Sequence, residues 1–167
     1  ELAAHILRHN ADILHVTPSR ITAYLSNRAF CEALGQVKAI LAAGEVLPGS
    51  LAKRLNDDYH IRIYNGYGPT ETTIGATITE AGDTTSIGTP IANMGVVLLN
   101  RQGRLVPFGA VGEICVHGNG VGIGYKDRPK ETEEKYIIWN GKRLYRTGDL
   151  GYFSQDGRVM YCGRNDR

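Results

Sequence analysis

The stretch HIRIYNGYGPTETTIGA, residues 60–76, decides the fold, because an apolar run leads directly into glycine and proline. Residues 60–64 predict a short strand, and the residues after it include Gly66, Gly68 and Pro69 among threonine and glutamate. A simple turn needs fewer conformationally special positions than this. Loops at the carboxyl ends of parallel strands are where open α/β sheets place ligands. The sequence therefore predicts a binding loop after this strand.

The side chains of this loop suit a nucleotide. Glycine lets the backbone approach a ligand closely, and threonine hydroxyls donate to phosphate oxygens. Tyr67 offers a flat face on which a base can stack, and Glu71 offers a hard oxygen ligand for Mg²⁺. From the residues alone this is a nucleotide-site hypothesis. The alternative is a glycine- and proline-rich loop with surface threonines.

Two further apolar runs precede the loop and give its setting. They are residues 12–16 and 37–41, and the three runs begin 25 and 23 residues apart. Helical stretches that begin with Pro18 and Pro48 separate these runs, because proline suits the first turn of a helix. Thr17 is the expected cap before Pro18. This spacing is typical of βαβ units. We predict an α/β fold with a parallel sheet over residues 1 to about 80.

The pattern changes after residue 75, where short apolar runs alternate with turn signals. NRQGR (100–104) and SQDGR (154–158) are the hairpin signals expected between antiparallel strands. One helix is expected over residues 129–137, with a solvated face and no site. We predict a small antiparallel sheet or distorted barrel. The expected division is an α/β part over residues 1–85 and a β-rich subdomain over 86–167.

Composition excludes several classes of protein. The net charge of +2, from 19 basic and 17 acidic residues, argues against nucleic-acid partners and anionic membranes. No apolar run approaches the roughly 20 residues that span a bilayer. The start lacks the pattern of a signal peptide and an initiator Met, so we expect the chain to begin within a longer protein. Three scattered cysteines predict no disulfide framework or zinc site, and favour a reducing, cytoplasmic location.

Several ordered stretches give the chain a family resemblance. YGPTETTI (67–74) resembles the phosphate-binding signature of adenylate-forming enzymes, in the form used by adenylation domains of nonribosomal peptide synthetases. That superfamily also contains acyl-CoA synthetases and luciferases. The other matching stretches are VTPSR (16–20), LAAGEVL (41–47), GEICVHGNGVGIGYKDRPKETEEKY (112–136) and YRTGDLGYFSQDGRVMYCGRNDR (145–167). Their order and intervals cover nearly the whole chain, which would make it part of the large N-terminal domain, ending at the hinge to a C-terminal domain.

The resemblance implies roles for individual residues. Thr70 would contact the α-phosphate and Glu71 would hold Mg²⁺, and with Arg164 they form the implied catalytic set. Nucleotide contacts are implied for Gly44, Glu45, Asn65, Gly66, Tyr67, Gly68, Thr70, Asp149, Tyr161 and Arg164, with Tyr67 on adenine and Asp149 on ribose. Asp166 would be the hinge. Three of these have alternatives: a charge favouring the next helix for Glu45, a surface ion pair for Arg164 and a core position for Tyr161.

An acid-binding pocket is implied in the same way. Its lining positions would be Val16, Leu41, Ala43, Gly66, Ile74 and Gly75. All six residues are apolar, and three are very small. A pocket without a charged or amide side chain cannot pair a buried ionic group, whose desolvation is costly. A bulky apolar or aromatic amino acid is therefore the expected substrate.

The resemblance thus implies part of an amino-acid-activating enzyme. It would form an aminoacyl-AMP from an amino acid and Mg-ATP, and load the acyl group onto the phosphopantetheine thiol of a carrier-protein domain beside neighbouring synthetase domains. By itself this chain should be unable to turn over. One alternative is an acyl- or aryl-CoA ligase, against which Pro69 and Asp166 argue. Another is a non-catalytic scaffold of the same fold.

Overall fold

The computed structural model describes residues 1–82 and 86–165. The chain divides into two compact units, and each is treated by itself. The first unit contains Glu1–Gly66 and a short stretch that begins at Thr79, and the second contains Tyr67–Ile78 and the chain after residue 85. The sequence-based division at residue 85 differs from this grouping mainly in residues 67–78, which belong to the second unit. The binding loop predicted after the third strand therefore belongs with the β-rich part of the chain.

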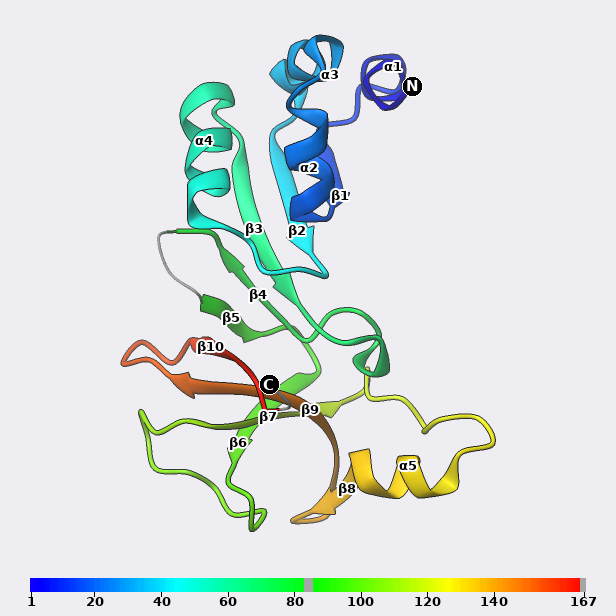
Figure 1. The fold of residues 1–167 in the computed structure, drawn as a ribbon, viewed down its shortest axis with the longest axis vertical. Coiled ribbons are helices and arrows are strands. Elements are labelled where there is room, and N and C mark those ends of the chain that lie inside the picture. Colours follow the sequence, from blue (N-terminus) through cyan, green and yellow to red (C-terminus); the bar gives the residue numbers. More distant parts are fainter. Residues whose placement is uncertain (83–85, 166–167) are drawn as a thin grey trace. The chain divides into compact units, whose positions relative to one another are not determined.

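Three parallel strands form the centre of the first unit (Figure 1). They are β1 (Ile13–Val16), β2 (Ala39–Ala43) and β3 (Arg62–Tyr67), with β2 in the middle. The crossovers contain α2 (Pro18–Tyr24), α3 (Arg28–Ala33) and the 3₁₀ turn η1 (Leu34–Gln36) before β2, and α4 (Gly49–Tyr59) before β3. Helix α1 (Leu2–Arg8) precedes β1. The predicted βαβ units are confirmed, with the strands shifted by one to three residues.

Local sequence signals explain where these helices begin. Pro18 occupies the first position of α2, where its missing N–H costs no hydrogen bond. Asn27 caps α3, because its side chain accepts a hydrogen bond of 3.1 Å from the N–H of Phe30. In α4 the buried residues Leu51, Ala52 and Leu55 recur at the spacing of one helical face.

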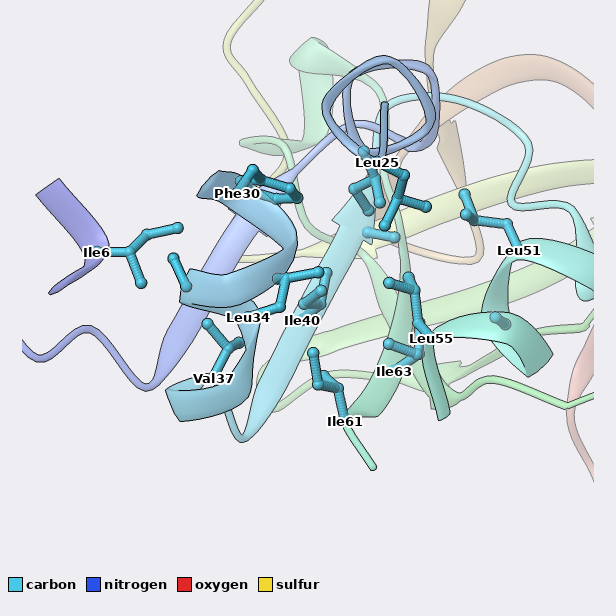
Figure 2. Close-up of a cluster of buried hydrophobic side chains, with 14 residues drawn as sticks. Ile6, Leu25, Phe30, Leu34, Val37, Ile40, Leu51, Leu55, Ile61 and Ile63 are labelled. Carbon is cyan, nitrogen blue, oxygen red and sulfur yellow. The ribbon is translucent and has the colours of Figure 1, made fainter. Parts of the chain in front are cut away.

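One apolar cluster joins these helices to one face of the parallel sheet, and Figure 2 shows it. Ile40 and Ile63 contribute from the strands, and Leu34 and Leu55 contribute from η1 and α4. All four are nearly or completely buried. Because such side chains lose most of their contact with water, this cluster is the main stabilising element of the first unit.

The second unit contains an antiparallel sheet in the order β5-β10-β9-β7-β6, with β8 on β9 and with Thr77 and Ile78 of β4 paired with β5 (Figure 1). A 3₁₀ turn, η2 (Thr70–Thr72), precedes it. The strands are β4 (Thr77–Glu80), β5 (Ser86–Pro90), β6 (Met94–Leu99), β7 (Gly112–Gly118), β8 (Tyr136–Trp139), β9 (Lys142–Phe153) and β10 (Val159–Arg164). The predicted antiparallel architecture is confirmed.

Side chains alternate across β7 as a strand buried on both faces requires. Ile114 and Val116 join one apolar cluster, while Cys115 between them joins a second. The hairpin predicted at residues 154–158 connects β9 to β10, where the N–H of Ser154 donates to the O of Arg158 over 2.9 Å. These contacts fix the ends of β9 and β10.

The helix predicted over residues 129–137 is shorter in the structure. Helix α5 (Pro129–Lys135) ends before Tyr136, which begins β8 and pairs with Tyr145 of β9. The run of aromatic and β-branched residues at 136–139 satisfies its backbone groups in the sheet. In the described part of the chain, no helix is both long and apolar enough to cross a membrane.

Candidate functional site

The loop after β3 folds back on itself. The N–H of Ala76 donates to the O of Tyr67 over 2.8 Å, so the chain returns beside the strand it has just left. A Cβ atom at Gly68 would lie 2.6 Å from the O of Ile74 and 2.7 Å from the N of Ala76. Real Cβ atoms do not approach backbone so closely. Gly68 is therefore required for the closure of the loop, a reason that differs from the ligand approach predicted for it.

Two β-branched residues in this loop adopt a left-handed backbone. Thr73 has φ of 57° and Ile74 has φ of 69°. Such residues are rare there, and strained backbone of this kind persists where surrounding contacts hold it. One such contact is the hydroxyl of Thr73, which donates to the O of Gly120 over 2.7 Å. The loop is held in a defined conformation.

Glu71 lies half-buried in η2, with its carboxylate against two tyrosines. The hydroxyl of Tyr125 donates to its Oε1 over 2.5 Å and lies 3.2 Å from the hydroxyl of Tyr145. Burial acts to raise the pKa of Glu71, but the hydrogen bond from Tyr125, the nearby hydroxyl of Tyr145 and the charge of Lys135 leave it below its ordinary value. The carboxylate is therefore ionised at neutral pH, and Thr70 exposes its side chain immediately before it.

Asp149 of β9 is the second carboxylate of the site, and it is 7% exposed. Its Oδ2 accepts from the hydroxyl of Tyr67 over 2.6 Å, and its Oδ1 accepts from Nη1 of Arg164 over 3.3 Å. Burial, followed by the charge of Asp149, raises the pKa of Tyr67, so the phenol stays protonated. Two predicted residues, Tyr67 and Arg164, thus contact the carboxylate of a third, Asp149.

Tyr161 of β10 lies half-buried beside this group. It packs against the same apolar cluster as Tyr67. This position is the one expected if Tyr161 is a core residue, and it also lies close to the residues of the candidate site. The Arg164 side chain is 42% exposed, and its ion pair with Asp149 links the last residue of β10 to β9.

Glu113 and Arg146 support the part of β9 that carries Asp149, and sequence reasoning missed both of them. Oε2 of Glu113 accepts from Nε and Nη2 of Arg146 over 3.0 and 2.5 Å, and its Oε1 accepts from the N–H of Gly148 over 3.1 Å. Both residues stand inside quoted stretches, but only their pairing across β7 and β9 shows the contact. A cavity of about 430 Å³ adjoins them, lined by Glu113, Glu134, Lys135, Arg146, Gly148, Arg164 and Asn165.

In the first unit, Glu45 has a different role from the predicted helix charge. Its Oε1 accepts from Oγ of Ser19 over 2.7 Å, and its Oε2 accepts from the N–H of Ser19 over 2.9 Å. These bonds lower the pKa of Glu45. The carboxylate therefore binds the first turn of α2, which precedes it, and not that of the following helix α4. Gly44 beside it has φ of 85°, which favours glycine, and Asn65 lies half-buried in β3.

The predicted acid-pocket residues lie on three strands and in the loop. Leu41, Ala43 and Gly66 share one face, because Gly66 is paired with Ala43, and a Cβ at Gly66 would lie 3.0 Å from Cδ1 of Leu41. Val16 is paired with Ala42 and packs against the buried cluster on the opposite face. Ile74 and Gly75 belong to the second unit. The predicted hinge, Asp166, lies outside the described residues.

Within the described residues, no three histidine, cysteine, aspartate or glutamate side chains gather as a metal site. Mg²⁺ is usually bound by one or two carboxylates together with substrate phosphates. The ionised, half-buried carboxylate of Glu71, next to the hydroxyl of Thr70, supplies hard oxygen donors of the right kind. The donor set therefore fits a magnesium ion that arrives with a nucleotide.

Comparison with known protein families shows which proteins this chain is similar to. Residues 1–126 match the family described as "AMP-binding enzyme". The chain belongs to the AMP-binding enzyme family. Tyrocidine synthase 1 of Brevibacillus parabrevis is 35% identical over 163 residues, and bacitracin synthase 3 of Bacillus licheniformis is 44% identical over 139 residues. The alignments cover 92% and 80% of this chain but only 14% and 2% of those synthases.

Solved structures of related proteins have the same fold. PA1221, described as an NRPS protein containing adenylation and PCP domains, superposes with a TM-score of 0.87 at 27% identity. The match covers 98% of this chain and 35% of that protein. CmiS6 gives the same TM-score at 26% identity. This member of the AMP-binding enzyme family therefore spans only part of the relatives it matches.

Proposed function

We propose that this AMP-binding family chain forms the nucleotide-binding part of an amino-acid-activating adenylation domain. The observation that carries the proposal is the convergence of Tyr67 and Arg164 on the buried carboxylate of Asp149, in the same unit as Glu71. The two oxygens of a carboxylate can accept from two neighbouring hydroxyls, which suits the vicinal hydroxyls of ribose. The similarity to peptide synthases and to a protein with adenylation and PCP domains supports this choice.

The chain's own residues then have distinct tasks. Tyr67 presents its ring to adenine while its hydroxyl remains on Asp149. Thr70 donates to the α-phosphate, and Arg164 offsets negative charge near the ribose and phosphate. Glu71 holds Mg²⁺, which when bound neutralises phosphate charge as pyrophosphate leaves. In this proposal the amino-acid carboxylate attacks the α-phosphorus and yields an aminoacyl-AMP.

The acyl group would next pass to the phosphopantetheine thiol of a carrier-protein domain. Support for this partner comes from the PCP domain named for PA1221 and from the synthase relatives. The amino acid would be bulky and apolar or aromatic, because Leu41, Ala43 and Gly66 form an uncharged face at the strand ends. The free thiols of Cys31, Cys115 and Cys162 fit a reducing compartment such as the cytoplasm.

Calorimetric titration with AMP and Mg-ATP tests the proposal. The wild-type protein should bind both, and a Glu71→Ala, Asp149→Ala double variant should lose binding while remaining folded by circular dichroism. Amino-acid-dependent pyrophosphate exchange by the full-length protein then identifies the substrate. A folded wild-type protein that binds neither nucleotide would overturn the proposal.

A further inference from the structure

We propose that Tyr125 is a positioning residue for Glu71, which holds the carboxylate in the orientation that receives a divalent cation. The inference rests on the proposed function, because it assigns Glu71 to Mg²⁺. Tyr125 lies 54 residues from Glu71 in the sequence, in the stretch between β7 and α5. The sequence of the loop that contains Glu71 does not by itself indicate a role for Tyr125.

The hydrogen bonds have a defined direction. The ionised carboxylate of Glu71 can only accept, so the hydroxyl of Tyr125 commits its single proton to Oε1 over 2.5 Å. The contact of 3.2 Å between the hydroxyls of Tyr125 and Tyr145 then requires Tyr145 as the donor. The result is a chain from Tyr145 through Tyr125 to Glu71, in which each bond polarises the next.

The backbone segments that carry Glu71 and Tyr125 are also linked by hydrogen bonds. The N–H of Gly122 donates to the O of Glu71 over 2.8 Å, three residues before Tyr125. The N–H of Tyr125 itself donates to Oγ1 of Thr132 in α5 over 2.9 Å. The phenol therefore projects from a fixed segment, and that segment also holds the main chain of η2.

Ring packing restricts the phenols further. The ring of Tyr136 contacts that of Tyr125 edge to face, with centroids 5.7 Å apart, and lies 5.1 Å from that of Tyr145. The guanidinium of Arg143 covers the Tyr136 ring at 4.8 Å. Since aromatic pairs and a cation over the ring favour one geometry, the hydroxyl of Tyr125 has little freedom to leave Glu71.

This arrangement leaves the carboxylate able to bind a cation. A carboxylate has about four lone-pair sites, so one bond from a phenol does not saturate it. Residues that hydrogen-bond to a metal ligand orient it, and their loss typically lowers metal affinity roughly 10- to 100-fold. Tyr125 is placed to act in this way on Glu71, because its hydroxyl donates directly to the carboxylate.

The test compares Tyr125→Phe with Tyr136→Phe in the full-length protein. Each variant removes one phenol oxygen from the same aromatic cluster, but within the described residues the Tyr136 hydroxyl makes no hydrogen bond. Calorimetry gives the dissociation constants of ATP with and without Mg²⁺, and of AMP without metal. In Tyr125→Phe we expect the strengthening of ATP binding by Mg²⁺ to fall on the order of 10-fold. AMP affinity should stay unchanged, and Tyr136→Phe should resemble wild type.

The opposite results separate this inference from the proposed function. Equal weakening of AMP and Mg-ATP binding in Tyr125→Phe would mean a general structural role and would overturn the inference. If Mg²⁺ strengthened ATP binding by Tyr125→Phe as much as by wild type, the inference would also be overturned. The same holds if the wild-type protein binds AMP but its ATP affinity does not rise with Mg²⁺. Both of these results leave the proposed nucleotide binding intact. A folded wild-type protein that binds neither nucleotide would refute both. If Tyr125→Phe does not fold, Tyr145→Phe, which removes the donor to Tyr125, should show the same selective loss.

Discussion

The hydroxyl of Tyr67 lies 2.6 Å from Oδ2 of Asp149, although 82 residues separate the two in the sequence. The bond joins Tyr67, the last residue of β3, to Asp149 within β9, and both residues belong to the second unit. It fixes the direction of the Tyr67 ring and satisfies a carboxylate that is almost fully buried. One contact therefore orients both the surface proposed for adenine and the group proposed for ribose.

Replacing Tyr67 by Phe tests this contact directly. The ring remains, but Asp149 loses a hydrogen bond to a buried charge, which is worth about 1.5–3 kcal/mol. Arg164 still neutralises part of the Asp149 charge, so we expect the unfolding free energy to fall by an amount near the lower end of this range. The AMP affinity should become several-fold weaker. Urea denaturation and calorimetry measure the two. Tyr152→Phe is the control, because Tyr152 lies on β9 as Asp149 does. Equal unfolding free energies and AMP affinities of the two variants would contradict the role given to the bond between Tyr67 and Asp149.

The same pair predicts an unusual tyrosine titration. The pKa of Tyr67 is raised above its ordinary value of 10.0, first by burial and then by the charge of Asp149. Because the folded pKa is the higher one, the stabilisation is complete below about pH 10 and is lost as pH rises beyond it. The tyrosinate absorbance of wild type and Tyr67→Phe should therefore rise identically up to about pH 11. An extra tyrosine titrating near pH 10 in wild type would show that Tyr67 is accessible.

The cysteines should differ sharply in reactivity. Burial, with the nearby charge of Glu113, raises the pKa of Cys115 to about 12, whereas Cys162 is exposed. Thiolate is the reactive form, so at pH 8 a disulfide reagent should label Cys162 quickly and Cys115 only after unfolding. Cys162→Ser should remove the fast phase. The neutral Cys115 thiol also stabilises the fold below about pH 9, and this contribution declines as pH rises towards 12. Fast labelling of Cys115 in the native protein would contradict its burial.

Gly68 is the position in the loop that should tolerate a side chain least. Its Cβ would meet the backbone of Ile74 and Ala76 at 2.6 and 2.7 Å, where no flexible side chain can move aside. Gly68→Ala should therefore lower the unfolding free energy by about 1–3 kcal/mol. Gly75→Ala is the matched control, because its Cβ would lie 3.6 Å from Cδ1 of Ile91, an ordinary contact. Equal stability of the two variants would show that the loop opens more easily than its hydrogen bonds indicate.

Local signals in the sequence were sufficient for the architecture. Apolar runs at regular spacing predicted β1, β2 and β3, and the turn at residues 154–158 predicted the β9–β10 hairpin. The helix over residues 129–137 was predicted two residues too long, because its last residues pair with β9, which lies later in the chain. The secondary-structure propensity of a short stretch takes no account of its pairing with a strand that lies later in the sequence.

The candidate site was predictable only where residue type and local pattern were sufficient. Tyr67 and Glu71 were proposed from residue type, Asp149 was added only by the family resemblance, and the structure brings Tyr67 and Asp149 into contact. Tyr125 and Glu113 could not be assigned, because their roles depend on partners 54 and 33 residues away. Such contacts depend on strand register and loop geometry, which no short window of sequence contains.

The pair of Glu113 and Arg146 gives the last prediction, because Glu113 of β7 contacts β9 at two positions, Arg146 and Gly148. Its Oε2 accepts two bonds from Arg146, while its Oε1 accepts the N–H of Gly148, the residue before Asp149. The Glu113 side chain is 9% exposed and that of Arg146 is 37% exposed, so solvent weakens the attraction only in part. Hydrogen bonding and charge from Glu113 also raise the pKa of Arg146, as expected of a bound guanidinium.

A double-mutant cycle measures this relationship. Glu113→Gln, Arg146→Gln and the double variant, compared with wild type by urea denaturation, should give a coupling energy of about 1–2 kcal/mol. Glu113→Ala should weaken AMP binding more than Arg146→Gln does, because only the former releases the N–H of Gly148, the residue in β9 that precedes Asp149. Additive losses would show that the ion pair contributes nothing beyond its separate residues. Equal AMP affinities would show that Asp149 keeps its position without Glu113.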